Sequence, residues 1–177
     1  MIYVFLADGF EEIEALAPTD ILRRGGKEVK TVAIKGKSAV GAHGIEVLCD
    51  IALKDIKDDA EMLILPGGMP GTKNLADSEK LVDLLKKAYE NKIPIGAICA
   101  APSILGELGL LKDKKATCFP GFEGYLDCLE VSDDFVIIDG NIITAKGAGA
   151  ALDFGFALLS VFDKDKAETL RKEMQCR

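Results

Sequence analysis

The residue with the clearest chemical potential is Cys99, in the stretch IPIGAICAAPSILGELG that covers residues 93–109. A strand-like run over 93–98 gives way there to a helix-like run from about 100 to 108. A cysteine on such a turn projects into the cleft at the sheet edge, and the N–H groups and dipole of the following helix favour its thiolate. A free cysteine also packs like a small hydrophobic residue. Spacing alone therefore leaves a nucleophile and a packing residue as alternatives.

A glycine-rich turn, LPGGMPGT over residues 65–72, follows another strand-like run. Glycines let backbone N–H groups approach an oxygen atom closely, as an oxyanion hole or an anion nest requires. The turn lacks the spacing of the nucleotide-phosphate motifs. Taken alone, the stretch is more typical of an ordinary tight loop.

Three carboxylates follow the first strand-like run, in the stretch GFEEIEA. Glu11 and Glu12 fall in the first turn of a predicted helix, where the dipole stabilises negative charge, and we expect no further role for them. Glu14 could face solvent or the cleft, and solvent is the usual environment of an isolated glutamate. His43 is the only histidine, and its setting in VGAHGIEV predicts a surface turn.

The cysteines and the single histidine do not form a metal-ligand pattern. No C-x-x-C occurs and the cysteine count is odd, which argues against a zinc site and a disulfide framework. We therefore expect no metal, and reduced thiols in the cytoplasm. The cysteines are Cys49, Cys99, Cys118, Cys128 and Cys176.

Strand-like and helix-like segments alternate, as in a mostly parallel sheet covered by helices on both faces. In such α/β sheets ligands bind at the carboxyl ends of the strands, where ADGFEE, PGGMPG and ICAAP lie. With no repeat or linker, one domain over 1–177 is expected. We predict strands at 2–7, 28–34, 45–51, 61–68 and 93–98, with 45–51 in a hairpin with the segment before it, and a second hairpin over 134–145. The predicted helices are 11–26, ended by its glycines, 78–92, 100–108, 149–162 and 163–174.

The net charge of −7 argues against nucleic acid or an anionic membrane as a partner, because both need clustered Lys and Arg. The apolar N-terminal run has no preceding basic residues and is followed at once by carboxylates, so it predicts a first strand and not a signal peptide. No apolar run is long enough to predict a transmembrane helix.

Four blocks together resemble the ThiJ/PfpI superfamily, in the branch of the parkinsonism-associated protein deglycase and its bacterial relatives. They are LADGFEEIEAL, ILPGG, AICAAP and KGAGAALDFGFALL, in the order and spacing of that family. The resemblance covers essentially the whole chain. It implies a flavodoxin-like α/β sandwich that forms a homodimer.

The resemblance also implies roles for single residues. Cys99 matches the reactive cysteine, and Glu14 matches a glutamate that is held protonated and hydrogen-bonds the thiolate. Gly67 and Gly68 match backbone donors that face the cysteine, with the Ala100 N–H beside it.

Several pocket positions match the family or depart from it. Arg24 matches an arginine near the dimer-related active site, and His43 stands where a relative has an arginine. Phe119, in TCFPG, replaces the histidine of the protease branch, so peptidase activity is not expected. Lys146 and Ala148 replace an arginine and a proline next to the pocket.

Two functions of different classes follow from these implied roles. The first is a glyoxalase or deglycase that needs no cofactor and acts on methylglyoxal, glyoxal or early glycation adducts through the Cys99 thiolate. The second is a non-catalytic redox sensor or oxidative-stress chaperone in which Cys99 is oxidised. A role in thiazole monophosphate metabolism follows only from a name attached to the family, and no phosphate-binding motif supports it.

Overall fold

In the computed structural model, which describes residues 1–176, seven strands form a central sheet in the order β10-β11-β7-β6-β1-β2-β5. Neighbouring strands are parallel except for the pair β10 and β11 at one edge. The strands are β1 (Ile2–Leu6), β2 (Val29–Ala33), β5 (Ile51–Ala52), β6 (Met62–Leu65), β7 (Ile95–Ile98), β10 (Val136–Asp139) and β11 (Ile142–Ala145).

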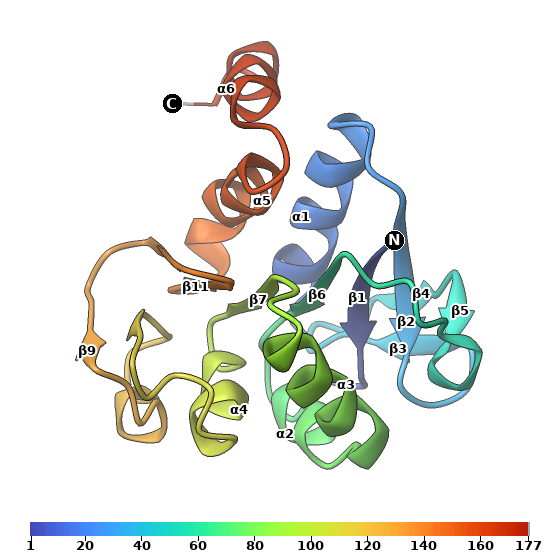
Figure 1. Ribbon diagram of the computed structural model, residues 1–177. Coiled ribbons are helices and arrows are strands. Elements are labelled where there is room, and N and C mark those ends of the chain that lie inside the picture. The colour runs from blue at the N-terminus through green and yellow to red at the C-terminus, as the bar shows by residue number, and fades with distance from the viewer. Residues whose placement is uncertain (177) are drawn as a thin grey trace.

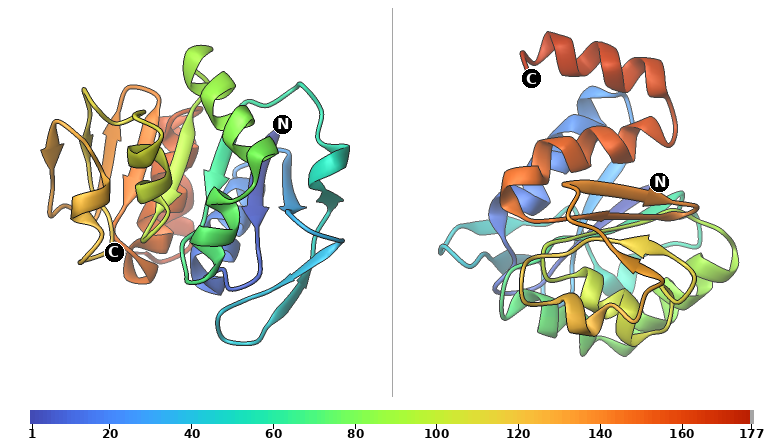
Figure 2. Two further views of the ribbon diagram at one scale, coloured as in Figure 1. Left: turned by 90° about the horizontal axis from the view of Figure 1, so that it is seen from below. Right: turned by 90° about the vertical axis from the view of Figure 1, so that its left-hand side faces the viewer.

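Helices cover both faces of the sheet because successive side chains of a buried strand point to opposite sides. Ile2 and Val4 of β1 pack against one helix layer, whereas Tyr3 and Phe5 pack against the other. Figures 1 and 2 show the two layers on either side of the sheet. The predicted flavodoxin-like sandwich is confirmed. One layer holds α1 (Glu12–Arg24), α5 (Ala151–Ser160) and α6 (Lys164–Glu173), and the other holds α2 (Gly71–Ala76), α3 (Glu79–Glu90) and α4 (Pro102–Glu107).

Two short strand pairs lie outside the central sheet. β3 (Ser38–Val40) and β4 (Glu46–Leu48) form an antiparallel hairpin, and β8 (Lys115–Ala116) pairs in parallel with β9 (Glu130–Val131). Single 3-10 turns connect larger elements at Leu53–Asp55, Glu123–Tyr125 and Ala148–Ala150.

Two predictions about the elements were wrong in detail. The predicted strand 45–51 is divided, because the Asp50 carboxylate accepts the N–H and hydroxyl of Thr31 and ends the run before β5. The predicted strand 61–68 ends earlier, at Leu65 of β6, and the last residues of the turn 65–72 begin the short helix α2 at Gly71, which was not predicted. The hairpin over 134–145 is confirmed as β10 and β11, and it turns at Gly140 with a φ of 61°.

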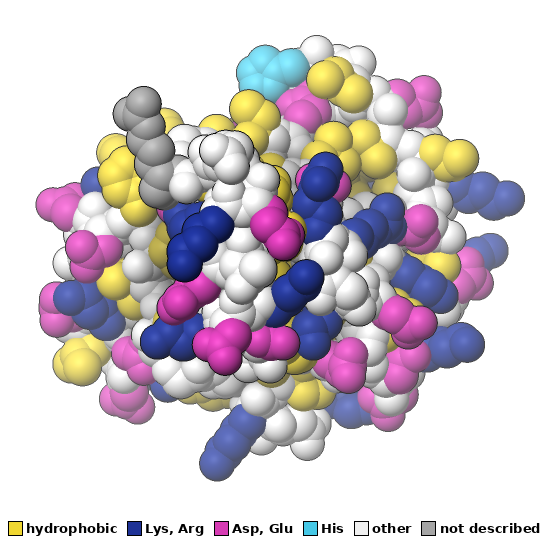
Figure 3. All heavy atoms as spheres, turned by 90° about the horizontal axis from the view of Figure 1, so that it is seen from above, with side chains coloured by type: hydrophobic (Ala, Val, Ile, Leu, Met, Phe, Trp, Pro, Cys, Tyr) yellow, Lys and Arg dark blue, Asp and Glu magenta, His cyan; other side chains and the backbone are white. Residues whose placement is uncertain are grey.

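Charged side chains of both signs are mixed on the face seen in Figure 3, and some of them pair. Arg171 of α6, for example, lies 2.6 Å from the Asp153 carboxylate of α5. Within residues 1–176, none of the helices is both long and apolar enough to span a bilayer.

Candidate active site at Cys99

Cys99 lies on the turn between β7 and α4. Its φ of 65° is in the left-handed region, which a non-glycine residue adopts only where its surroundings hold it. Two backbone bonds of 2.8 Å do so: the Cys99 N–H donates to the Ala145 carbonyl, and the Phe119 N–H donates to the Cys99 carbonyl. The side chain is only partly buried. The turn therefore has the geometry of a nucleophile elbow, and α4 starts slightly later than predicted, at Pro102.

Glu14, on the first turns of α1, is the carboxyl group that the fold brings to Cys99. The residue is 1% exposed, so the expectation of solvent that its type alone suggested is wrong. Its Oε2 accepts the Gly67 N–H over 2.9 Å, and its side chain also hydrogen-bonds the Cys99 side chain. Its Oε1 is buried with no hydrogen-bond partner among the described residues. This oxygen is therefore the natural position for a proton.

Burial penalises the charged form of both groups. Burial raises the pKa of the Glu14 carboxyl from 4.5 to about 7, although hydrogen bonds from Cys99 and Gly67 lower it. Burial also raises the pKa of the Cys99 thiol, to about 12, and the charge of Glu14 adds to the rise. The low thiol pKa predicted from the turn is therefore wrong for this structure, in which burial and the neighbouring Glu14 outweigh the backbone donors. A thiolate costs least when Glu14 holds the proton, because repulsion is then replaced by a hydrogen bond.

Backbone N–H groups of Gly68 and Ala100 face the Cys99 sulfur and lower its pKa. Gly67 was expected beside them, but its N–H is bound to Glu14. Gly67 is needed for a different reason: a Cβ there would lie 2.7 Å from both Cys99 Cβ and Glu14 Oε2. Only a residue without a side chain lets β6, β7 and α1 meet this closely.

A second buried carboxylate, that of Glu12, lies two residues before Glu14 and is 5% exposed. Its Oε1 accepts the N–H groups of His43 over 2.9 Å and Ile45 over 3.4 Å, and its Oε2 lies 2.9 Å from His43 Nδ1. Burial would raise the pKa of Glu12, but these hydrogen bonds outweigh it and lower the pKa. The prediction that Glu12 only complements the helix dipole is wrong.

His43 lies in an exposed turn, as predicted, but it is not isolated. The hydrogen bond to Glu12 and the charges of Glu11 and Glu12 raise its pKa. In residues 1–176 these three residues are the group whose ligand atoms come within 4.8 Å of one another, close enough to share a metal ion. A histidine–carboxylate ion pair already accounts for their arrangement, with His43 Nδ1 also 3.5 Å from Glu11 Oε2. This cluster could not be predicted from the sequence, because the turn and the helix are far apart along the chain.

Phe119 and Lys146 border the cysteine through their backbones. The Phe119 N–H holds the Cys99 carbonyl, while its ring is 47% exposed. Lys146 follows Ala145, and its ammonium pairs with Asp133 over 3.1 Å. The lysine charge is thus directed toward the loop before β10.

Arg24 lies at the opposite end of α1 from Glu14 and pairs with Asp20 over 2.7 Å. Ten residues of α-helix span about 15 Å, so Arg24 is not part of the Cys99 site of its own chain. Its expected place near the site of a second subunit stays a prediction.

An open groove of about 450 Å³ is lined by residues that follow the donors in the chain, and its lining includes none of Cys99, Glu14, Gly68 and Ala100. Met69, which follows Gly68, lies at one end, and Ile104 of α4 forms part of the floor. Phe122 and Tyr125 complete the wall after the Phe119 turn. The segments that form the groove therefore follow directly from the segments that hold the sulfur.

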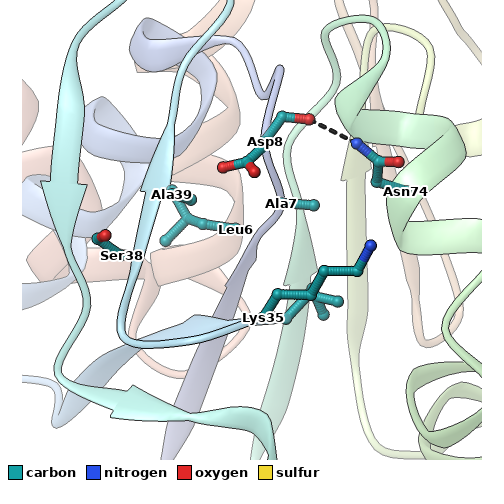
Figure 4. A pocket seen from close by; sticks show the side chains of 8 residues that line it. Leu6, Ala7, Asp8, Lys35, Ser38, Ala39 and Asn74 are labelled. Carbon is teal, nitrogen blue, oxygen red and sulfur yellow. Dashed lines mark hydrogen bonds between the residues drawn. The ribbon is translucent and has the colours of Figure 1, made fainter.

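A second, much smaller pocket of about 30 Å³ lies between the carboxyl ends of β1 and β2 (Figure 4). Asn74 of α2 donates to the Asp8 carbonyl there over 2.8 Å. Its lining includes neither Cys99 nor Glu14. This contact ties α2 to the loop after β1 and thereby helps to position the loop that leads into α1.

The fold is a flavodoxin-like α/β sandwich, and its candidate site has a cysteine on a strand-to-helix turn. A buried carboxyl group and two backbone donors lie beside the thiol. These features together are those of a protein with a reactive cysteine at a nucleophile elbow. The chain belongs to the DJ-1/PfpI family: the sequence profile of that family matches residues 1–161.

Relatives and solved structures agree with this assignment. Protein DJ-1 homolog B of Arabidopsis thaliana is 41% identical over 165 residues, which are 91% of this chain and 37% of that protein. The chain thus spans well under half of that relative. The glutathione-independent glyoxalase DJR-1.2 of Caenorhabditis elegans is 33% identical, with 93% of this chain and 89% of that protein covered.

A deglycase of Pyrococcus abyssi is 30% identical, with 84% of this chain and 90% of that protein covered. The structure of oxidized DJ-1 from Toxoplasma gondii superposes with a TM-score of 0.95 at 29% identity, covering 99% of this chain and 97% of that one.

Proposed function

We propose that this protein is a cysteine-dependent glyoxalase or deglycase that needs no cofactor and acts on methylglyoxal, glyoxal or early glycation adducts. The observation that carries the proposal is the pairing of the Cys99 thiol with buried Glu14, between the N–H groups of Gly68 and Ala100. A thiol, an acid and two donors are the groups needed to add to an aldehyde and stabilise the resulting alkoxide.

In the proposed reaction with methylglyoxal, the Cys99 sulfur attacks the aldehyde carbon and the Gly68 and Ala100 N–H groups bind the alkoxide. Glu14 gives its proton to that oxygen, and the carboxylate then removes the proton from the former aldehyde carbon. Delivery of that proton to the neighbouring ketone carbon, with transfer of the hydroxyl proton to the ketone oxygen, gives a lactate thioester. The aldehyde carbon is oxidised while the ketone carbon is reduced, so no external oxidant is required. Water then cleaves the thioester and releases lactate and Cys99.

Similarity to proteins named glyoxalase and deglycase supports the same reading. The neighbouring groove of about 450 Å³ has room for the part of a glycation adduct that extends beyond the reacting carbon. Comparing kcat/KM for methylglyoxal with kcat/KM for a glycated amino acid would show which of the two substrate classes the enzyme prefers.

The test is lactate formation from methylglyoxal without glutathione, compared between wild type, Cys99→Ala and Cys176→Ala. Cys176 is remote in sequence and offers a matched cysteine control. We expect activity in wild type and Cys176→Ala and none in Cys99→Ala. Equal rates in wild type and Cys99→Ala would rule out the mechanism.

A redox-sensor role is the second candidate, because the donors that would hold an alkoxide could equally hold the oxygens of a sulfinate. The superposed Toxoplasma gondii structure is described as oxidized, which supports testing it. Intact-mass and peptide mapping after mild peroxide should place the first oxygen on Cys99. Earlier oxidation of Cys176 would contradict this role.

A homodimer is proposed on the basis of exposed apolar side chains on α1 and the β3–β4 hairpin. Ile13 is 55% exposed, Ile45 is 55% exposed and Leu48 is 77% exposed. Burying such side chains against a second copy removes apolar surface from water. Analytical ultracentrifugation should give twice the chain mass for wild type, and a monomer at all concentrations would contradict the proposal.

A further inference from the structure

We propose that Glu12 is a positioning residue for the Cys99 site: its buried carboxylate fixes the start of α1, which in turn aims the Gly67–Gly68 peptide at the sulfur. The kinetic part of this inference rests on the proposed function, whereas its effect on thiol reactivity does not.

The peptide unit between Gly67 and Gly68 connects α1 to the thiol. Its carbonyl accepts the Glu11 N–H over 2.9 Å, and its N–H is the Gly68 donor that faces Cys99. The C=O and N–H of a trans peptide point in opposite directions. Glu11 therefore holds one end of the unit whose other end holds the sulfur. A hydrogen bond to the carbonyl also polarises the peptide and strengthens its N–H as a donor.

The backbones of these two segments are in direct contact. A Cβ on Gly68 would lie 2.5 Å from the Glu11 nitrogen and 2.6 Å from the Gly9 carbonyl oxygen. No side chain separates the start of α1 from the peptide. A shift of Glu11 therefore moves the Gly68 donor directly.

Glu12 anchors the start of α1 to the turn of the β3–β4 hairpin. Its carboxylate accepts two backbone N–H groups, those of His43 and Ile45, and contacts the His43 ring. Gly41 packs against the same carboxylate so closely that a Cβ there would overlap it. A buried carboxylate with this many donors is held in one place, as a positioning element must be.

Glu12 is distinct from Glu14, although both lie on one helical turn. Glu14 interacts with the thiol itself, whereas the Glu12 carboxylate is hydrogen-bonded to His43 and Ile45 in the turn 43–45. Loss of the Glu12 carboxylate should leave the substrate groove intact and misdirect one donor. This predicts a change in turnover and thiol reactivity with little change in KM.

The experiment compares Glu12→Ala and Glu12→Gln with the matched control Glu46→Gln. Glu46 lies on the same hairpin. Among residues 1–176 its carboxylate accepts one hydrogen bond, from the Ser38 hydroxyl. Two quantities are measured: kcat and KM for lactate formation, and the rate of Cys99 alkylation by iodoacetamide from pH 5 to 9, mapped by mass spectrometry.

We expect Glu12→Ala to lower kcat on the order of 10-fold with KM within about 2-fold, and to move the alkylation profile to higher pH. Glu12→Gln keeps an oxygen acceptor for the two N–H groups but loses the charge, so it should recover part of the loss and stay about 3-fold below wild type. Glu46→Gln should match wild type in both assays.

Wild-type kcat and a wild-type alkylation profile in folded Glu12→Ala would overturn the inference. Should circular dichroism show Glu12→Ala unfolded, the comparison of Glu12→Gln with Glu46→Gln decides: about 3-fold slower alkylation in the first supports the inference, and equal rates overturn it. Absence of lactate formation in wild type would reject the proposed function, while the alkylation profiles would still test Glu12.

Discussion

The first turns of α1 place two buried carboxylates two residues apart in opposite electrostatic environments. Glu12 accepts several hydrogen bonds, and its pKa is lowered. Glu14 is also buried but has one N–H donor and one unpartnered oxygen, and its pKa is raised to about 7. Both side chains are nearly inaccessible to solvent, but Glu12 lies just beneath the surface turn 43–45 whereas Glu14 lies deeper. Depth of burial and the number of donors together therefore decide the sign of the shift. The ionised Glu12 carboxylate is suited to fix the turn 43–45 against α1, and the Glu14 carboxyl is suited to exchange a proton.

The largest expected difference between the two is in turnover. Glu14→Gln cannot donate or accept the catalytic proton and should lower kcat by on the order of 10²–10⁴-fold. Glu12→Ala should cost only on the order of 10-fold. Initial rates of lactate formation from methylglyoxal measure both. Equal losses at the two positions would break the comparison.

The two carboxylates should affect stability with opposite dependence on pH. The raised pKa of Glu14 means that its favourable contribution is fully present below pH 4.5 and lost as pH rises through about 7. Glu14→Gln should therefore gain on wild type over this range, by up to about 3 kcal/mol.

The lowered pKa of Glu12 works the other way. Its contribution is present above the ordinary glutamate pKa and is lost as pH falls below it, so Glu12→Gln should be furthest below wild type near neutral pH. Urea denaturation from pH 4 to 8 under reducing conditions measures both curves. Parallel curves for the two variants would contradict the assigned environments.

The close contact of Gly67 with Cys99 and Glu14 requires a residue without a side chain. A smaller effect, on stability alone, is therefore expected at Gly67. Gly67→Ala forces a Cβ against Cys99 and Glu14 and should lower the free energy of unfolding by about 1–3 kcal/mol. Gly124→Ala is the matched control, since a Cβ there meets nothing within 4 Å, and it should change stability by less than about 0.5 kcal/mol. Equal losses in urea denaturation would show that the close approach is not tight.

The smallest effect is expected at His43, on the exposed side of Glu12. Its raised pKa means that the stabilising ion pair is complete below the ordinary histidine pKa and is lost as pH rises through the higher folded value. His43→Gln should therefore differ from wild type more at pH 6 than at pH 9. Because His43 is the only histidine, one imidazole NMR signal reports its pKa directly. A value at or below that of free histidine would contradict the link to Glu12.

Much of this could be predicted from the sequence because its signals are local. Alternating apolar runs predicted the parallel sheet, and the small residues around Cys99 predicted its turn. The glycines of LPGG were correctly placed at a strand end, since a missing side chain is visible in the sequence. The divided strand at Asp50 was missed because it depends on a bond to Thr31, nineteen positions away.

Residue types and their order thus determined the fold class, the elbow and the set of groups available for chemistry. Only the tertiary structure decided what each group does. It placed Gly67 against Glu14 and not against the sulfur, gave Glu12 its donors from a distant turn, and left one oxygen of Glu14 without a partner. The reason is physical: the pKa of a buried carboxylate depends on the donors packed around it, and those donors come from segments that are remote in the chain.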